Sequence, residues 1–352
     1  MLPTCHCSVA ISPIRPGMEA VAGFKSWPSM WLLAAMLWLA TPQAASAQQA
    51  DTYSWKVVQH DSRDYVTLQG LKEFYRFQQF VREGRSARLV SPALTMEMSV
   101  GSQELLINNV KFILSFPIIE QGGETLMSRL DLAKIVDPVL RPAFIRNIRP
   151  FTTVVIDPGH GGHDTGARST YGTEKDYVLD LGTRLQRLLV EQGFNVVMTR
   201  ETDVFVSLGD RVKIANEHED AIFISLHFNA ASNRSARGIE TFALSPQGAS
   251  SAYGARANDG SAFTGNLRDA ENIALATAVH ASVLHYLPST DRGIKRARWA
   301  VLRGIELPGI LFEGGFLSNS EDARLIASPA HRQRMAQAIG AAVVSYRNAL
   351  RR

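Results

Sequence analysis

Residues 152–160 read Thr-Thr-Val-Val-Ile-Asp-Pro-Gly-His, a β-branched apolar run that ends in a turn and a histidine. A short apolar run of this kind is typical of a strand that is buried on both faces of a parallel sheet. Further apolar strands alternate with helical patterns from this point to the end of the chain. The alternation predicts an α/β fold with a mixed, mostly parallel sheet flanked by helices.

The elements expected around this strand follow from hydrophobic spacing and from capping residues. We expect further strands over residues 195–198, 221–226, 238–244 and 309–312, and helices over 176–191, 208–217, 271–287 and 330–350. The segment between residues 244 and 269 is rich in glycine, serine and alanine. We expect it to form a flexible loop near the functional edge of the sheet.

A different pattern precedes residue 150. Short alternating strands are separated by turn residues, and helical spacing occurs over residues 71–82 and 127–135. We therefore expect a small α+β domain over residues 48–150 and a second domain over 151–352. No histidine occurs between residues 61 and 159, so the small domain has little to offer a transition metal.

The first 47 residues have the layout of an export signal. Basic residues precede the apolar run from Met30 to Ala40, and Ala45-Ser-Ala47 follows with the small residues that signal cleavage needs. Both cysteines of the chain, Cys5 and Cys7, belong to this segment. We expect cleavage after Ala47, an exported protein in the periplasm or cell envelope, and no disulfide in the mature chain.

Charge and motif patterns exclude several classes of partner. The 37 lysines and arginines exceed the 33 acidic residues by only four, with no long basic block, so nucleic acid is not an expected partner. The glycine-rich loop at 157–166 has neither the ending of a P-loop nor the spacing of a dinucleotide fingerprint, so no nucleotide is expected either.

Four residues that can bind a metal or move protons are expected at one edge of the sheet. His160, His227 and Glu313 each follow an expected buried strand, and Glu174 precedes an expected helix. The carboxyl ends of strands meet at one edge of an open α/β sheet, where ligands bind. Each residue alone has an ordinary structural explanation, but their coincidence favours a metal site built from imidazole and carboxylate groups.

The surrounding loops contain further polar residues with weaker signals. Asp157 and Asp164 could orient metal ligands or simply form turns, and Asn229 could bind substrate or end a strand. His163 could be a third imidazole ligand, but a position in the loop or on the substrate side fits it better.

Several ordered motifs of the chain resemble those of the zinc-dependent N-acetylmuramoyl-L-alanine amidases. They are Asp157-Pro-Gly-His-Gly-Gly with Asp164, Glu174-Lys-Asp176, Ser225-Leu-His-Phe-Asn-Ala230, Ala236-Arg-Gly-Ile-Glu240 and Phe312-Glu-Gly-Gly-Phe-Leu-Ser-Asn319. The resemblance covers about residues 152–349 and implies the zinc amidase fold. It implies one Zn²⁺ per catalytic domain, with His160, Glu174 and His227 as ligands and Glu313 as the catalytic glutamate.

The implied reaction is hydrolysis of the peptidoglycan amide between N-acetylmuramic acid and L-alanine by zinc-activated water, with Glu313 as the general base. Two alternatives remain at this point: another exported zinc amide hydrolase such as a carboxypeptidase, and a non-catalytic cell-wall-binding module. Some members of the family carry a helix that blocks the zinc in the segment matching residues 245–269. The glycines and serines found there argue against a long helix in this chain.

Residues 62–145 loosely resemble a copper-amine-oxidase N-terminal-like domain, which implies a copper-free accessory module. A protein activator or a wall anchor is the partner expected for this region, besides peptidoglycan as the substrate.

Overall fold

The computed structural model describes residues 53–254 and 259–350 of the 352-residue chain. The expected export signal over residues 1–47 lies outside these ranges and stays a prediction. Within them, no helix combines the length and the apolar character that a membrane crossing requires.

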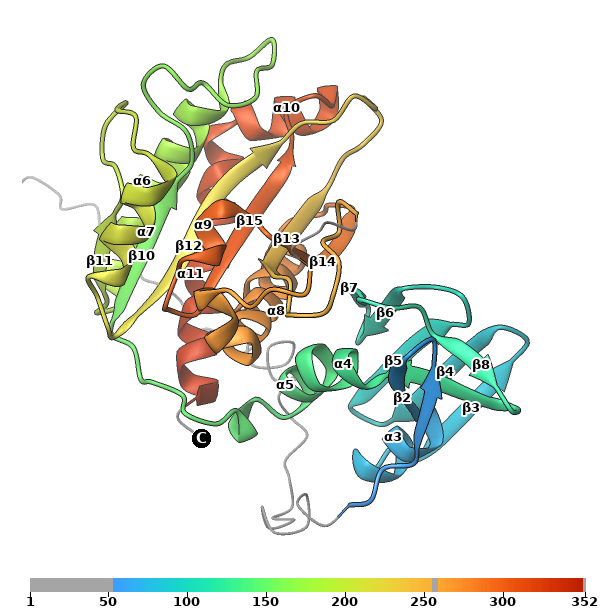
Figure 1. The fold of residues 1–352 in the computed structure, drawn as a ribbon. Helices are drawn as coiled ribbons and strands as arrows, with labels where there is room; N and C mark the ends of the chain where they lie inside the picture. The colour runs from blue at the N-terminus through green and yellow to red at the C-terminus, as the bar shows by residue number, and fades with distance from the viewer. Residues whose placement is uncertain (1–52, 255–258, 351–352) are drawn as a thin grey trace, which may run out of the picture.

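The sheet that follows residue 150 is mixed and mostly parallel, as expected (Figure 1). Its strands lie in the order β11-β10-β12-β15-β13-β14, with β13 antiparallel to β15 and the other neighbours parallel. Their bounds are β10 Thr153–Pro158, β11 Asn195–Met198, β12 Ala221–Asn229, β13 Ile239–Leu244, β14 Asp291–Ala297 and β15 Gly309–Phe316.

Helices cover both faces of this sheet. Their bounds are α6 Glu174–Glu191, α7 Leu208–Asn216, α8 Asp269–Tyr286, α9 Ala300–Arg303, α10 Ser320–Ala327 and α11 Pro329–Leu350, with a 3₁₀ turn η3 at Thr264–Arg268. Val154 and Ile156 pack into the core formed with α6, α8 and α11, whereas Val155 packs into the core formed with α7 and α9. This alternation within β10 follows from the two-residue period of a strand, and it explains the unbroken apolar run in the sequence.

The contact between α6 and the sheet depends on a glycine. A Cβ atom at Gly182 would lie 3.1 Å from a side-chain carbon of Pro158 and 3.1 Å from one of Met198. The helix therefore lies close to the ends of β10 and β11, and its first residue, Glu174, is brought over the edge of the sheet.

The region before residue 150 is small and β-rich. A four-stranded sheet has the order β1-β2-β9-β8, and β7-β6-β5-β4-β3 continue the large sheet beyond β14 through the pair Ile294 and Phe112 (Figure 1). The bounds of the strands are β1 Val57–His60, β2 Arg63–Thr67, β3 Gln79–Glu83, β4 Ser86–Ser91, β5 Leu94–Ser99, β6 Glu104–Ile107, β7 Val110–Ile113, β8 Ile119–Gln121 and β9 Glu124–Ser128. Its helical segments are α3 Leu68–Phe74, α4 Arg129–Asp131, η1 Leu132–Val136, α5 Asp137–Leu140 and η2 Pro142–Phe144. The division into domains at residue 150 stays a prediction.

Both helices expected in this region form, but with different bounds. The helix expected over 71–82 ends at Phe74, because Arg76 takes a left-handed backbone conformation (φ 59°) and residues 79–83 pair with β4 instead. The helix expected over 127–135 begins only at Arg129, where the Ser128 hydroxyl accepts hydrogen bonds from the Leu130 and Asp131 amides as an N-cap.

Among the elements that follow residue 150, β14 and α10 were not expected. Strand β14 has the sequence Asp-Arg-Gly-Ile-Lys-Arg-Ala, whose charges and glycine hide its strand character. Helix α10 is short and begins at Asn319, which caps it by accepting from the Glu321 and Asp322 amides.

Candidate active site

Three residues that can bind a metal converge at the carboxyl edge of the sheet. His160 lies two residues beyond β10, Glu174 is the first residue of α6, and His227 lies on β12. One ligand atom from each lies within 4.8 Å of the others. The structure therefore brings together the three residues for which the sequence predicted zinc binding.

The carboxylate of Glu174 is at the centre of this cluster. Its Oε1 atom is 3.1 Å from Nε2 of His160 and 2.9 Å from Nδ1 of His227. The same oxygen accepts the Phe228 amide, and Oε2 accepts the Ala167 amide at 2.8 Å. Burial raises the pKa of Glu174, but the bonds and charges of the two histidines outweigh it, so the pKa is held well below its ordinary value.

His160 is held in place from its other ring nitrogen. Its Nδ1 is 2.9 Å from Oδ2 of Asp164, which leaves Nε2 directed at Glu174. Burial lowers the pKa of His160, but Glu174 and Asp164 together raise it above its ordinary value. A carboxylate on the outer nitrogen is the arrangement that orients histidines in metal sites, so Asp164 has the position of an orienting residue.

Glycines allow the loop to close around the cluster. A Cβ atom at Gly159 would lie 2.2 Å from the imidazole of His227, and one at Gly166 would lie 2.5 Å from Oε2 of Glu174. His160 itself adopts a left-handed conformation with φ of 59°, which is uncommon for a residue with a side chain. The backbone is thus shaped to let the three side chains meet.

Glu313 lies beside the cluster. It is opposite His227 in the register of β12 and β15, and its side chain is 7% exposed. Its Oε2 atom is buried and has no hydrogen-bond partner among the described residues. Burial raises the pKa of Glu313 well above its ordinary value, and the negative charges of Glu174 and Glu240 raise it further.

Asp157 has a structural role. It is fully buried, and its carboxylate accepts hydrogen bonds from Arg211, Thr199 and Ser225 at 2.6 to 2.8 Å. Arg211 also donates to the carbonyl oxygen of His160, so this ion pair anchors the loop that carries the histidine. Asp157 is not part of the metal-binding group.

Asn229 and His163 differ in their relation to the site. Asn229 donates to Oε2 of Glu240 at 3.0 Å, which places it next to the carboxylates but not in the cluster. His163 is exposed and packs on the ring of Phe205 with centroids 4.3 Å apart. It lies outside the metal-binding group, in agreement with the preferred loop position.

Three neighbouring residues were given no role from the sequence. Glu240 is opposite Glu313 in the pairing of β13 and β15, and its Oε1 accepts from Arg292 at 2.7 Å and from Lys295 at 2.6 Å. Glu240 entered the sequence analysis only as the last residue of a family motif. Arg292 and Lys295 lie on β14, which was not expected. The charged residues of β14 were the signal that could have revealed them.

The segment over residues 245–269 passes near the same edge. Within the described parts, 245–254 and 259–269, only the 3₁₀ turn η3 and the first residue of α8 are helical, so the expected absence of a long helix is confirmed there. The ring of Tyr253 packs on Phe242 and Trp299. Burial raises the pKa of Tyr253, and the negative charges of Glu240 and Glu313 raise it further.

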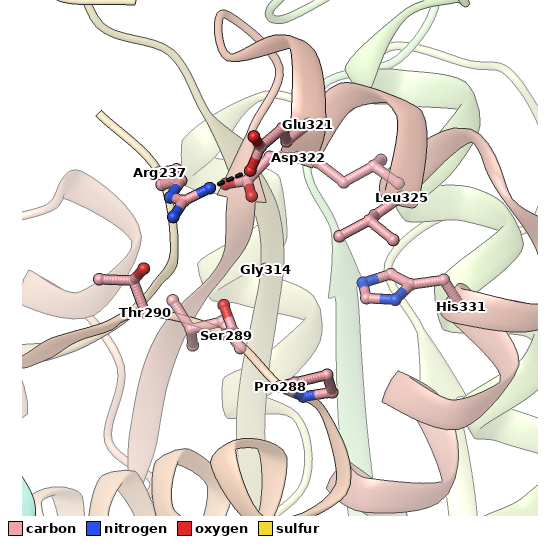
Figure 2. Close-up of a pocket in the computed structure, with 11 residues that line it drawn as sticks. Arg237, Pro288, Ser289, Thr290, Gly314, Glu321, Asp322, Leu325 and His331 are labelled. Carbon is pink, nitrogen blue, oxygen red and sulfur yellow. Dashed lines mark hydrogen bonds and ion pairs between the residues drawn. The ribbon is translucent and has the colours of Figure 1, made fainter. Parts of the chain in front are cut away.

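A cavity of about 250 Å³ is lined by residues that include parts of β15, α10 and α11 (Figure 2). Leu325 and His331 form one wall, and Arg237 and Thr290 lie across from them. Gly314 lines the cavity and faces the core formed with α11, since a Cβ atom there would meet Met335.

Comparison with known proteins identifies the family. The family model described as N-acetylmuramoyl-L-alanine amidase matches residues 154–345, more than half of the chain. This chain belongs to that family. The match spans all four residues predicted from the motifs.

Two curated amidases and one solved amidase are similar to part of this chain. The N-acetylmuramoyl-L-alanine amidase AmiA of Escherichia coli is 33% identical over 219 residues, covering 55% of this chain and 75% of that protein. The AmiC amidase of an Escherichia coli O6:H1 strain is 32% identical over 243 residues, covering 61% of this chain and 58% of that protein. The solved AmiC2 amidase of Nostoc punctiforme is 33% identical and covers 58% of this chain and all of that one, with a TM-score of 0.48.

Membership confirms the expected family and reaction class. The chain is a hydrolase of the N-acetylmuramoyl-L-alanine amidase family, and peptidoglycan amide hydrolysis is favoured over the carboxypeptidase and over the non-catalytic module. The roles of the individual site residues, the metal and the N-terminal region stay predictions.

Proposed function

We propose that this protein is an exported, zinc-dependent N-acetylmuramoyl-L-alanine amidase that uses His160, Glu174 and His227 as zinc ligands and Glu313 as the catalytic acid and base. The observation that carries the proposal is the convergence of two imidazoles and one carboxylate beside a buried glutamate whose Oε2 has no hydrogen-bond partner among the described residues. The proposal assigns one Zn²⁺ to each catalytic domain.

The donor atoms fit zinc. Two imidazole nitrogens and a carboxylate oxygen are a known ligand set for catalytic zinc, which keeps one position open. The Asp164 carboxylate on the outer nitrogen of His160 supports the fit, because metal-bound histidines usually donate there. A zinc ion held by these residues would supply a Lewis acid that acidifies water and polarises the amide carbonyl.

Glu313 then transfers the protons. Glu313 lies on the strand next to that of His227. Its Oε2 atom accepts no hydrogen bond from any described residue. Its carboxylate accepts a proton from the attacking water, and its raised pKa favours keeping that proton until the amide nitrogen departs. The water oxygen ends on the lactyl carbonyl carbon and the proton on the nitrogen of L-alanine, so an acid and a free amine are formed.

Product analysis tests the reaction. Purified peptidoglycan is digested with the wild type and with Glu313→Ala, and the released fragments are identified by mass spectrometry. We expect peptides that begin with a free L-alanine amine from the wild type and a loss of about 10²- to 10⁴-fold in rate from the variant. Release of only a carboxy-terminal residue would instead show a carboxypeptidase, and full activity of the variant would refute the role of Glu313.

Metal dependence is tested separately. A chelator should abolish dye release from labelled peptidoglycan, and added Zn²⁺ should restore it. An unchanged rate after the metal has been removed and its absence measured would contradict the zinc proposal.

The proposed location of the protein is inferred from its first 47 residues. We propose export to the periplasm or cell envelope, with cleavage after Ala47, which places the enzyme beside its substrate. Sequencing the amino terminus of the exported protein should give Gln48 first. A protein activator or wall anchor that binds residues 48–150 remains a prediction.

A further inference from the structure

A row of charged side chains continues across the sheet from the catalytic edge. Glu240 on β13 pairs in register with Glu313, and Arg292 on β14 contacts Glu240. Neighbouring strands lie about 4.8 Å apart, so Arg292 begins two strand spacings, roughly 10 Å, from Glu313. The side chain of Arg292 extends back toward Glu313, because its Nε donates to Oε1 of Glu240, which lies on the strand between them.

The guanidinium of Arg292 is oriented by one hydrogen bond and one ring contact. Nε donates to Glu240 at 2.7 Å, and Cζ lies 4.8 Å from the centre of the Phe316 ring. The two terminal nitrogens donate to no residue in the described parts of the chain, and the side chain is 33% exposed. An arginine held in this way presents its planar fork of donors, which matches a carboxylate.

Two cations share the carboxylate of Glu240. Lys295 donates to the same oxygen of Glu240 at 2.6 Å, and Asn229 donates to the other oxygen. The buried carboxylate of Glu240 thus faces two cations. Glu240 alone does not balance both cations, and Arg292 is the one whose terminal donors meet no acceptor among the described residues.

The distance suits a particular group of the substrate. An extended peptide advances about 3.5 Å per residue, so a group on the second residue after the cleaved amide lies roughly 7 Å from it. In peptidoglycan that residue is commonly D-glutamate joined through its γ-carboxyl group, which leaves the α-carboxyl group as a free carboxylate or as a carboxamide.

We propose that Arg292 binds the free α-carboxylate of the second stem-peptide residue and makes the enzyme select it over the carboxamide. This subsite rests on the proposed amidase function. Glu240 and Phe316 orient the guanidinium, and Glu313 lies one strand beyond Glu240 at the cleaved bond. A carboxamide carries no charge and gives only one acceptor oxygen to the fork, so it binds less well.

The test uses two soluble N-acetylmuramoyl tripeptides that differ only in the second residue, one with the α-carboxylate and one with the α-carboxamide. The full-length wild type, Arg292→Gln and Arg292→Lys are compared by kcat/KM on both. Arg129→Gln is the matched control, because Arg129 also forms a single ion pair, with Asp64, but lies far along the chain from the site. Zinc content and thermal unfolding verify that each variant is folded.

We expect the wild type and Arg129→Gln to prefer the carboxylate substrate. Arg292→Gln should lose about 10- to 100-fold on that substrate and change little on the carboxamide, while Arg292→Lys should retain part of the preference. Equal losses on both substrates, or a wild type that treats them alike, would overturn the subsite. A wild type that cleaves neither substrate nor intact peptidoglycan would refute the amidase function itself, which is a distinct outcome.

Discussion

Glu313 lies directly opposite His227 in the parallel pairing of β12 with β15, and both side chains face the same side of the sheet. Side chains alternate along a strand, so a shift of one residue in this register would turn Glu313 into the opposite core. The neighbour Gly314 already faces that core and packs against Met335 and Phe228. The register of two buried strands therefore determines whether the candidate ligand and the candidate acid and base can meet.

Metal content should separate the two roles. We expect His227→Ala to lose zinc and activity together, because one of three ligand atoms is removed. Glu313→Ala should lose activity and keep zinc, because its carboxylate lies outside the metal-binding group. Zinc is measured by elemental analysis after dialysis, alongside dye release. Loss of zinc from Glu313→Ala would assign Glu313 to the metal instead.

Asp164 should matter through His160. The variant Asp164→Asn removes the charge on the outer nitrogen of the histidine, and we expect zinc affinity to fall by about 10- to 100-fold. Asp203→Asn is a suitable control, since Asp203 bonds to Lys175 and to the Gly162 amide on the same loop but does not contact His160. Competition with a zinc-binding dye measures both affinities. Equal effects of the two variants would mean that Asp164 only shapes the loop.

Removing Arg211 should destabilise the protein strongly. Its partner Asp157 is fully buried, so Arg211→Met leaves an uncompensated charge, which typically costs about 3–5 kcal/mol. Urea unfolding of Arg129→Met gives the comparison, because the exposed pair of Arg129 with Asp64 contributes at most about 1 kcal/mol. If the two variants unfold at the same urea concentration, the buried pair does not anchor the loop as described.

The sequence predicts the part of the fold whose side chains face only apolar neighbours. β10, β12 and β15 are apolar on both faces, so their strand character is visible in any short window. β14 is not, because its charged side chains pair with residues on other elements, Asp291 with His280 of α8 and Lys295 with Glu240 of β13. No local pattern reports such a partner.

The candidate site divides in the same way. His160 and Glu174 flank a strand and begin a helix that the sequence reveals, and His227 and Glu313 lie on two strands that it also reveals, so their shared edge could be predicted. Arg292 could not be included, because its orientation depends on Glu240, which lies 52 residues away along the chain. The contact exists only once β13 and β14 have paired.

The stability of the protein should depend on pH through Asp131. This carboxylate is completely buried and accepts the amides of Ser115 and Phe116, and burial raises its pKa to about 6, against the opposing effects of these bonds and of Arg296. The folded protein then holds a proton that the unfolded chain, with a pKa near 3.8, releases earlier. The stabilisation is complete below about pH 3.8 and is lost as the pH rises through about 6, by at most about 3 kcal/mol.

Asp131→Asn lacks this titration, so the free energy of unfolding of the wild type, measured in urea relative to the variant, should fall between pH 4 and 7. A relative stability that instead rises with pH would show that Asp131 is charged in the folded protein.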